Sequence, residues 1–310
     1  MTGDPGPVVA ALLTIISAST PLLLAATGEL VTERSGVLNL GLEGMMLIGA
    51  IVAFATAVGT GSSTLGIFAA MLAGSAAALI FAVLTLQFLA NQVATGLALT
   101  IFGTGLSALV GSGYVGRGIE PLPRLHLPVL SELPVIGPLL FGQDALIYAS
   151  FILLAGCSFF LYRTHAGLAL RSIGESHDAA HAIGYPVIRV RYLATLFGGA
   201  MSGLSGAYMS LAYSPSWSEG MTGGRGWIAL ALVVFATWRP ARLLLGAYLF
   251  CAIAILQLYI QAWGWPIPSQ FLTMLPYLAT IAVLVLISSD RARVRLMAPA
   301  CLGKPFYAAG

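Results

Sequence analysis

Long apolar runs follow one another along the chain and are separated by short polar segments. They cover residues 8–27, 37–58, 64–86, 89–111, 145–162, 192–213, 226–237, 243–262 and 271–288. Apolar runs of about 18 or more residues are typical of transmembrane helices, whereas residues 226–237 are too few for a full crossing and favour a half-helix or re-entrant segment. The pattern predicts an all-α fold, a single polytopic transmembrane helical bundle over residues 1–310 with about 8–10 spans.

A charged stretch interrupts this pattern at residues 28–46. Its ionisable residues are Glu29, Glu33, Arg34 and Glu43, and the next charge along the chain is Arg117. Charges at membrane depth are costly and usually face a bundle interior or a wet cavity. Four glycines in the stretch disfavour an unbroken helix, and broken helices are typical of transporter binding regions.

We therefore expect a broken helix near residues 28–46. The predicted structural break comprises Glu33, Arg34, Gly36 and Gly41. A loop among lipid head groups is the alternative for Glu29, Glu33 and Arg34, but it accounts less well for Asn39 and Glu43, which lie inside the next apolar run. We expect Glu43 to face the protein interior near Gly41.

Composition supports a membrane protein and excludes several other classes. Hydrophobic residues make up 58% of the chain, charged residues only 8%, and the mean hydropathy is +0.93. The net charge of +3 is too small and too dispersed to indicate nucleic-acid binding. Residues 1–7 contain no basic residue, so we expect the first apolar run to be retained as a span. The three cysteines are far apart and are predicted to be small packing residues.

The basic residues indicate the orientation in the membrane. Ten of the fourteen lie in the loop 163–191, in the loop 239–242 or in the C-terminal tail, which alternating spans place on one side. That side is predicted to be cytoplasmic. The opposite side carries the long loop 112–144, which contains five prolines with apolar residues between them. We expect this loop to form a compact lid or a docking surface, with a passive connector as the alternative.

A short helix is predicted in the cytoplasmic loop 163–191. Ser176 is a suitable N-cap and Gly184 a suitable stop, which leaves about two turns between His177 and Ile183. Ala179, Ala180 and Ile183 would form a small apolar face suited to docking, although an ordinary interfacial helix has the same pattern. His177 and His181 lie one turn apart without a third ligand nearby, so no metal site is expected.

Four segments resemble a known family. Glu33–Met46 reads ERSGVLNLGLEGMM, which is similar to the signature of ABC importer permeases in the ribose, branched-chain amino acid and nucleoside group, especially its nucleoside (basic-membrane-protein) branch. Asp178–Gly184 reads DAAHAIG and resembles the Glu-Ala-Ala-x-x-x-Gly coupling motif, with Asp in place of Glu. Gly223–Pro240 and Leu275–Thr280 resemble the nucleoside permeases as well.

The resemblance implies a multi-pass permease subunit of the cell (inner) membrane. Its partners would be an ABC ATPase subunit, an extracellular or periplasmic solute-binding protein and a second permease, either a sister chain or a second copy. Nucleosides would be the substrate, with a simple sugar or a branched-chain amino acid as alternatives, and an ATP-independent channel as a more distant one. The residues expected to couple to the ATPase are Arg171, Glu175, Asp178, Ala179, Ala180, Ile183 and Gly184.

Polar and aromatic side chains within the apolar runs are candidates for the substrate path. They are Asn39, Glu43, Asn91, Gln92, Tyr208, Trp217 and Gln257. Amides and a carboxylate can pair with ribose hydroxyls and base edges, and aromatic rings can stack on a base. Hydrogen bonding between helices uses the same residue types and is the alternative for each.

Enzymatic motifs are missing from the sequence. It contains no HExxH metal motif and no glycine-rich Walker loop. The chain is therefore expected to be non-catalytic, to need no cofactor or metal, and to rely on a partner for ATP hydrolysis. Glycine-rich helix segments, such as 103–105 and 199–203, predict close helix packing.

Overall fold

The computed structural model describes residues 7–125, 136–262 and 298–307, with scattered positions between 268 and 282. Its elements in chain order are α1 (Pro7–Arg34), α2 (Leu42–Thr60), α3 (Ser63–Ala82), the π-helix η1 (Val83–Gln87), α4 (Gln92–Gly111), the 3-10 turn η2 (Ser112–Tyr114), α5 (Ile136–Phe141), α6 (Ala145–Arg163), α7 (His165–Glu175), α8 (His177–Ala182), α9 (Val187–Tyr208), the π-helix η3 (Met209–Tyr213), α10 (Arg225–Phe235) and α11 (Pro240–Ala262). Across these ranges the chain forms helices and turns, and strand-like pairing is limited to two isolated bridges.

Six helices of the described ranges are long and apolar enough to cross a membrane, namely α1, α2, α3 with η1, α4 with η2, α6 and α11. The predicted all-α polytopic bundle is therefore confirmed. Helix α10 spans 11 residues, or about 17 Å at 1.5 Å per residue, and matches the expected half-helix. The expected span 271–288, with the segment Leu275–Thr280, lies largely outside the described residues.

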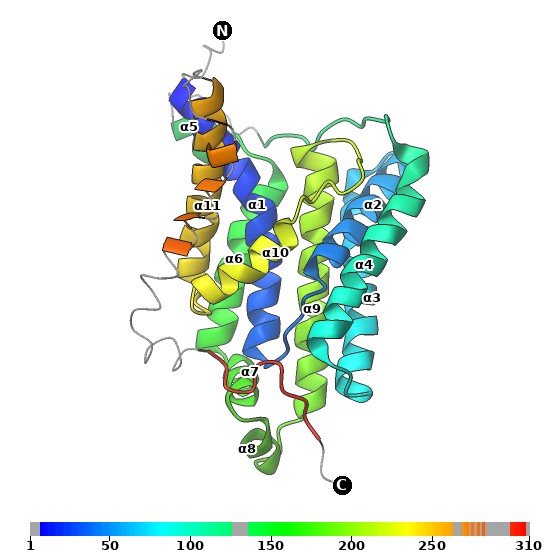
Figure 1. The fold of residues 1–310 in the computed structure, drawn as a ribbon, viewed down its shortest axis with the longest axis vertical. Coiled ribbons are helices and arrows are strands. Elements are labelled where there is room, and N and C mark those ends of the chain that lie inside the picture. Colours follow the sequence, from blue (N-terminus) through cyan, green and yellow to red (C-terminus); the bar gives the residue numbers. More distant parts are fainter. Residues whose placement is uncertain are drawn as a thin grey trace.

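Helix α9 is the central element of the bundle (Figure 1). It packs against α1, α2 and α3, which makes it the neighbour shared by these three spans. Glycines permit this close approach, because a Cβ at Gly203 would overlap the carbonyl oxygen of Ala70 on α3. Gly49 on α2 faces the backbone of Gly203 in the same way. Small residues at such crossings let helix backbones come together in a membrane.

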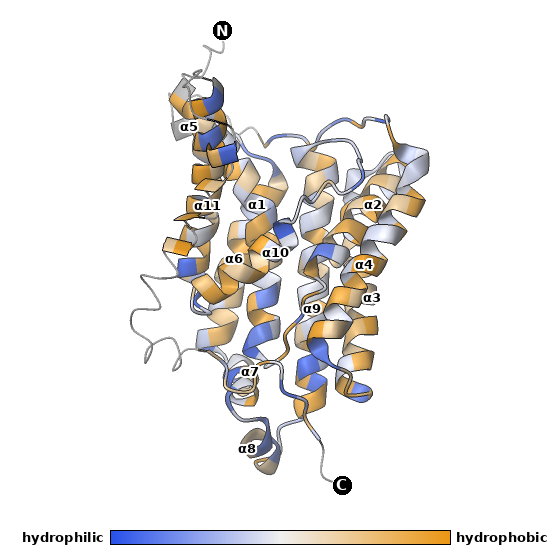
Figure 2. Cartoon of the chain, in the orientation of Figure 1, coloured by the Kyte–Doolittle hydropathy of each residue, from blue (hydrophilic) through white to orange (hydrophobic). Residues whose placement is uncertain are grey.

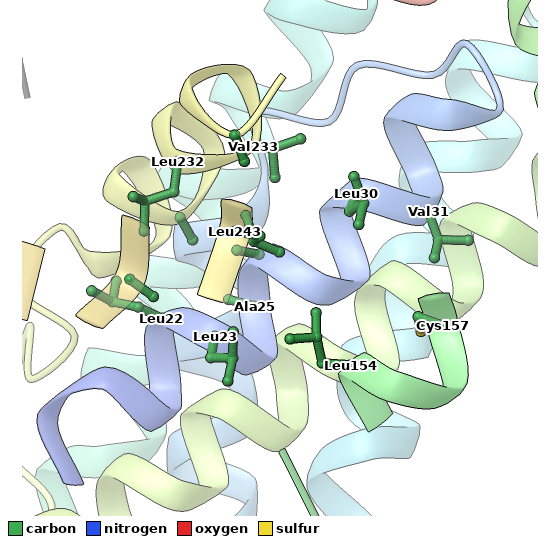
Figure 3. Close-up of a cluster of buried hydrophobic side chains, with 14 of the residues drawn as sticks. Leu22, Leu23, Ala25, Leu30, Val31, Leu154, Cys157, Leu232, Val233 and Leu243 are labelled. Atoms are coloured by element: carbon green, nitrogen blue, oxygen red, sulfur yellow. The ribbon is translucent and has the colours of Figure 1, made fainter. Parts of the chain in front are cut away.

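Apolar side chains join α1 to α6, α10 and α11. Figure 3 shows Leu22, Leu23, Leu30 and Val31 of α1 among side chains of those helices, which include Leu154, Cys157, Leu232, Val233 and Leu243. All three cysteines are free and buried, as predicted. Helix α1 therefore lies between α9 with its partners on one side and α6, α10 and α11 on the other.

The loops divide between two ends of the molecule (Figure 1). Helices α7 and α8 lie at the same end as the C-terminal segment, whereas α5 and the start of α1 lie at the opposite end. The corner between α10 and α11 lies beside the last turns of α1 and α6, because the carbonyl of Trp238 accepts hydrogen bonds from Arg34 and Tyr162. Hydrophobic residues line the flanks of the spans, and hydrophilic ones gather on α7, α8 and the nearby ends of the long helices (Figure 2).

Candidate translocation and coupling sites

The helix break is narrower than the sequence indicates. Helix α1 continues to Arg34, and only residues 35–41 are non-helical, with Gly36 at φ +89° where the chain turns. Glu29 and Glu33 belong to the last turns of α1 and are fully buried. The alternative that they lie in a loop among head groups is therefore wrong. Burial of a carboxylate at this depth requires polar partners. In the described part of the chain one oxygen of each carboxylate accepts a hydrogen bond, whereas Oε2 of Glu29 and Oε1 of Glu33 have no partner.

Polar side chains around the break bind its free backbone groups. The carboxylate of Glu29 accepts a hydrogen bond from the Asn39 amide at 3.2 Å, and the side chain of Asn39 accepts one from the Gly41 amide at 2.9 Å. The side-chain oxygen of Gln92 accepts one from the Leu38 amide at 2.8 Å. Buried backbone donors without a helical partner must be satisfied in this way. Asn39 and Gln92 therefore stabilise the break.

Glu43 binds the start of the half-helix α10. One of its carboxylate oxygens accepts hydrogen bonds from the Thr222 hydroxyl at 2.6 Å and the Gly224 amide at 2.8 Å, and the other from the Gly226 amide at 2.6 Å. The positive end of a helix favours a carboxylate in this position. A Cβ on Gly226 would overlap the backbone of Glu43, so glycine is required there. The expectation that Glu43 faces the interior is confirmed, although the backbone that it holds is that of α10.

Glu33 and Arg34 bind the other end of α10. Glu33 accepts a hydrogen bond from the indole nitrogen of Trp238 at 2.5 Å, and Arg34 donates one to the Trp238 carbonyl at 3.0 Å. Thr237 and Trp238 have φ values of +50° and +53°, a region that residues with a side chain adopt only at an energetic cost. The stretch around the break therefore holds the half-helix at both ends.

A cavity of about 880 Å³, which we call the outer cavity, is lined in part by residues 142–144, which join α5 to α6. Its lining combines polar and apolar groups from three parts of the chain: Leu13, Thr14, Ser17, Pro121, Leu122, Pro123, Arg124, Gly142, Gln143, Asp144, Tyr208, Ala212 and Tyr213. Tyr208 and Tyr213 both face it because η3 winds as a π-helix, whose wide turn brings residues five apart to the same side. Asp144 caps α6, and burial raises its pKa.

The described parts of the loop 112–144 are hydrogen-bonded to η3 and to the segment that follows it. The Ile119 amide donates to the Pro215 carbonyl at 3.1 Å, and the Leu122 amide donates to the Leu211 carbonyl at 3.3 Å. Together with the cavity lining by Pro121 and Pro123, these bonds place this part of the loop against η3 and the end of α9 at Tyr208.

The short helix α8 lies where the sequence predicts it. Ser176 caps it by accepting a hydrogen bond from the Ala179 amide at 3.3 Å, and Gly184 ends it at φ +92°. Asp178, Ala179 and Ile183 are exposed, and Ile183 exposes 73% of its surface. This leaves an apolar residue at the tip of the loop without a partner in the described part of the chain.

The prediction that Ala180 belongs to the docking face is wrong, and the structure also shows the surroundings of His177, Arg171 and Glu175. Ala180 is only 2% exposed and packs against Ile173, Val187 and Phe306, so it does not belong to an outward face. The same inward turn of the helix buries His177. Arg171 stacks on the ring of Tyr162, and Glu175 is exposed at the end of α7.

Comparisons with known proteins identify the family. A family model described as "Branched-chain amino acid transport system / permease component" matches residues 11–287. The chain belongs to this permease family. It is 41% identical to the "Putative glucose ABC transporter permease protein TsgC13" of Haloferax volcanii, over 93% of this chain and 94% of the relative. No solved structure matches the chain.

Two further relatives of the permease are named for nucleosides. The guanosine ABC transporter permease protein NupQ of Bacillus subtilis is 33% identical over 85% of this chain and 87% of its own length. The nucleoside ABC transporter permease protein NupC of Lactococcus lactis is 34% identical over 86% of this chain and 89% of its own length. The chain is thus a member of an ABC transporter permease family and, with its apolar helices, a multi-pass membrane protein.

The structure of the permease does not gather the seven candidate path residues along one path. Asn39, Glu43 and Gln92 bind backbone groups at the break and at α10, and Asn91 caps α4 by accepting from the Ala94 amide. Trp217 packs against Gly111 between α2 and α4, and Gln257 is buried on α11. Tyr208 is the member of the seven that lines the outer cavity. The side chains of Asn39, Asn91 and Gln92 thus accept hydrogen bonds from backbone amides. The spacing of these residues in the sequence does not reveal this.

Several residues that organise the permease were not singled out from its sequence. Arg191, Thr222 and Trp238 bind groups that lie far away in the chain. Arg191 shares the first turns of α9 with Arg189, and the sequence alone does not distinguish the buried arginine from the exposed one. The signal for Trp238 is its position next to Arg239 and Pro240 at the end of a short apolar run.

Proposed function

We propose that this chain is the permease subunit of an ABC importer for a small solute that contains a sugar ring, either a nucleoside or a simple sugar. The observation that carries the proposal is the similarity over 85% or more of the chain to permeases named for glucose, guanosine and nucleosides. All of these solutes contain a sugar ring. The signature at Glu33–Met46 favours a nucleoside, and the 41% identity to the glucose-named relative favours a simple sugar.

The outer cavity suits such a solute. Its volume of about 880 Å³ lies within the usual range for small-molecule sites. Ser17, Asp144 and Tyr208 offer hydroxyl and carboxylate groups that can pair with sugar hydroxyls, and Tyr213 adds an aromatic ring. The cavity would receive the solute from a binding protein on the side of α5.

The opposite end suits an energy-supplying partner. Exposed α8 would dock into a groove of an ATPase subunit, since the sequence of this chain contains no Walker loop of its own. A second permease, either a sister chain or a second copy, would complete the transporter in the cell (inner) membrane. The end that carries α7, α8 and the C-terminal segment would then be cytoplasmic, and the N-terminal end of α1 would lie outside.

Uptake by the reconstituted complex tests the proposal. Vesicles containing the permease, its ATPase and its binding protein are expected to accumulate guanosine, adenosine, ribose or glucose when the ATPase has ATP, but not with a non-hydrolysable analogue. Thermal stabilisation of the binding protein by the same solutes would identify the preferred one. Uptake that is independent of ATP would indicate a channel, and a response to leucine alone would contradict the sugar-ring assignment.

A further inference from the structure

Arg191 connects three segments at the end of the bundle that carries α8. It lies in the first turns of α9 and is only 1% exposed. Its guanidinium donates to the Ser35 carbonyl at 3.1 Å and to the Lys304 carbonyl at 3.2 Å, and it lies 3.3 Å from Nδ1 of His177. A rigid guanidinium has five donors and can hold several acceptors in fixed geometry, which a lysine ammonium cannot.

The contact with His177 brings Arg191 to the start of α8. Burial and then the charge of Arg191 lower the pKa of His177, while neighbouring Asp178 opposes this effect. Because a guanidinium can only donate, Nδ1 of His177 is the acceptor in this contact, which requires the neutral ring with its proton on Nε2. The ring of Phe306 packs edge-on against both His177 and His181, with centroids 5.3 Å apart in each case. Arg191 and Phe306 therefore hold α8 through the side chains of His177 and His181.

Residues 301–306, which we call the tail strap, hold the same two regions together. The Cys301 amide donates to the Gly174 carbonyl in α7 at 2.8 Å, and the Gly303 amide donates to the Gly36 carbonyl in the break at 3.1 Å. Phe306 then reaches α8. The tail strap therefore repeats, through backbone bonds, the connection that Arg191 makes through its side chain.

The break continues this connection toward the half-helix. Ser35 and Gly36 directly follow Glu33 and Arg34, which hold the end of α10, and Glu43 on the other side of the break holds its start. Hydrogen-bonded and closely packed elements run without interruption from α8, through Arg191 and the tail strap, to the break and both ends of α10. Such contiguous networks can carry a displacement because packed interiors are hardly compressible.

We propose that Arg191 and the tail strap transmit movement of α8 to the helix break and, through it, to α10. The inference rests on the proposed function, since it assigns the route by which the ATPase would act on the membrane part. Arg191 is then a positioning residue for coupling, and α10 is the element that is moved.

Hydrogen exchange on the purified permease tests the connection without any partner. Arg191→Lys keeps the charge, but an ammonium cannot donate to Ser35, Lys304 and His177 in the geometry of the guanidinium. It is expected to raise the exchange of amides in residues 177–183 and in residues 35–41 together, by about tenfold. Arg189→Lys, at an exposed position two residues earlier in the chain, should change neither region. Faster exchange in α8 alone, or no change in either region, would overturn the proposed connection.

Coupling is measured in the reconstituted complex. Arg191→Lys is expected to keep assembly and ATP hydrolysis near the wild-type level while uptake falls by about tenfold or more. Phe306→Ala should shift the ratio of uptake to hydrolysis in the same direction through the tail strap. Normal uptake, or a parallel loss of assembly, hydrolysis and uptake, would reduce Arg191 to a structural role. If the wild-type complex shows no ATP-driven uptake, the proposed function fails, whereas the exchange experiment still decides the connection.

Discussion

Glu43 illustrates how a single charged residue is accommodated at membrane depth. A buried carboxylate is stabilised only when hydrogen-bond donors replace water, and Glu43 has three of them within 2.8 Å. Two of the donors are backbone amides at the start of α10, where the helix dipole adds to the attraction. The carboxylate therefore serves as the N-terminal cap of a helix that has none of its own, because Gly224 cannot provide a side chain.

Substitutions at Glu43 should separate these contributions. Glu43→Gln retains one acceptor oxygen but turns an amide group toward the Gly226 donor, and is expected to cost about 1.5–3 kcal/mol of stability. Glu43→Leu leaves all three donors buried and unpaired, and should cost more than about 3 kcal/mol and abolish transport. Both variants should still reach the membrane. Thermal unfolding in detergent and vesicle uptake provide the measurements, and wild-type behaviour of the leucine variant would contradict this role.

The sequence predicts that these residues are buried but not which groups they meet. The interior position of Glu43 follows from a charge within an apolar run, whereas Thr222, its partner, is 179 residues away along the chain. Ala180 was placed on an outward face because it is a small residue next to Ala179 in a short helix. In the structure it packs against Phe306 of the tail strap and therefore faces inward. Asn39 and Gln92 were candidates for the substrate path, with hydrogen bonding between helices as the alternative, and in the structure their side chains accept hydrogen bonds from backbone amides.

At the scale of elements, helix lengths and the half-helix follow from the apolar pattern, but their contacts depend on close backbone approach. The glycine-rich segment 199–203 was predicted to pack closely, and Gly199 and Gly203 do meet the backbone of α3. The same prediction for 103–105 holds for Gly103, which faces Gly44, but is wrong for Gly105, which has open space around it. A glycine at a crossing and a glycine facing outward have the same sequence context, so only the packing distinguishes them.

Replacing glycine by alanine should therefore have opposite effects on stability at these two kinds of position. Gly203→Ala would push a methyl group into the Ala70 carbonyl and force α3 and α9 apart, and should destabilise the permease by about 1–3 kcal/mol. Gly105→Ala, also within a helix, should be neutral or stabilise by up to about 1 kcal/mol, because alanine favours the helix. Apparent melting temperatures of the two purified variants provide the comparison. Equal shifts would show that the seam between α3 and α9 is loosely packed.

At the scale of the whole molecule, the outer cavity and the exposed α8 lie at opposite ends of one bundle. Helix α9 runs between these ends, from Val187 beside α8 to Tyr208 at the cavity. The loop 163–191 and the C-terminal segment share an end, in agreement with the distribution of basic residues, although the sequence does not indicate that the tail strap packs onto α8. That contact joins residues more than a hundred positions apart, and no local pattern marks it.

The exposed tip of α8 provides the most direct test of a partner at this end. Ala180→Asp is unsuitable because it would place a carboxylate in the core of the loop, and Gly184→Glu would strain a residue at φ +92°. Ile183→Asp changes a side chain that is 73% exposed, so the fold of the permease should persist. An unpaired carboxylate in a packed contact should reduce retention of the ATPase by about tenfold or more, and uptake with it.

Ile183→Leu is the matched control, since it keeps an apolar side chain of the same volume and should retain the ATPase. Co-purification measures retention, and the melting temperature of the isolated permease should be the same for both variants, because the side chain at position 183 is 73% exposed. A lower melting temperature for Ile183→Asp alone would reveal an internal contact. If Ile183→Asp binds the ATPase and takes up solute as the wild type does, another surface must make the contact. If only the aspartate variant loses the ATPase, the apolar tip of α8 is the docking element, because charge at one exposed position then decides assembly without any change in the fold.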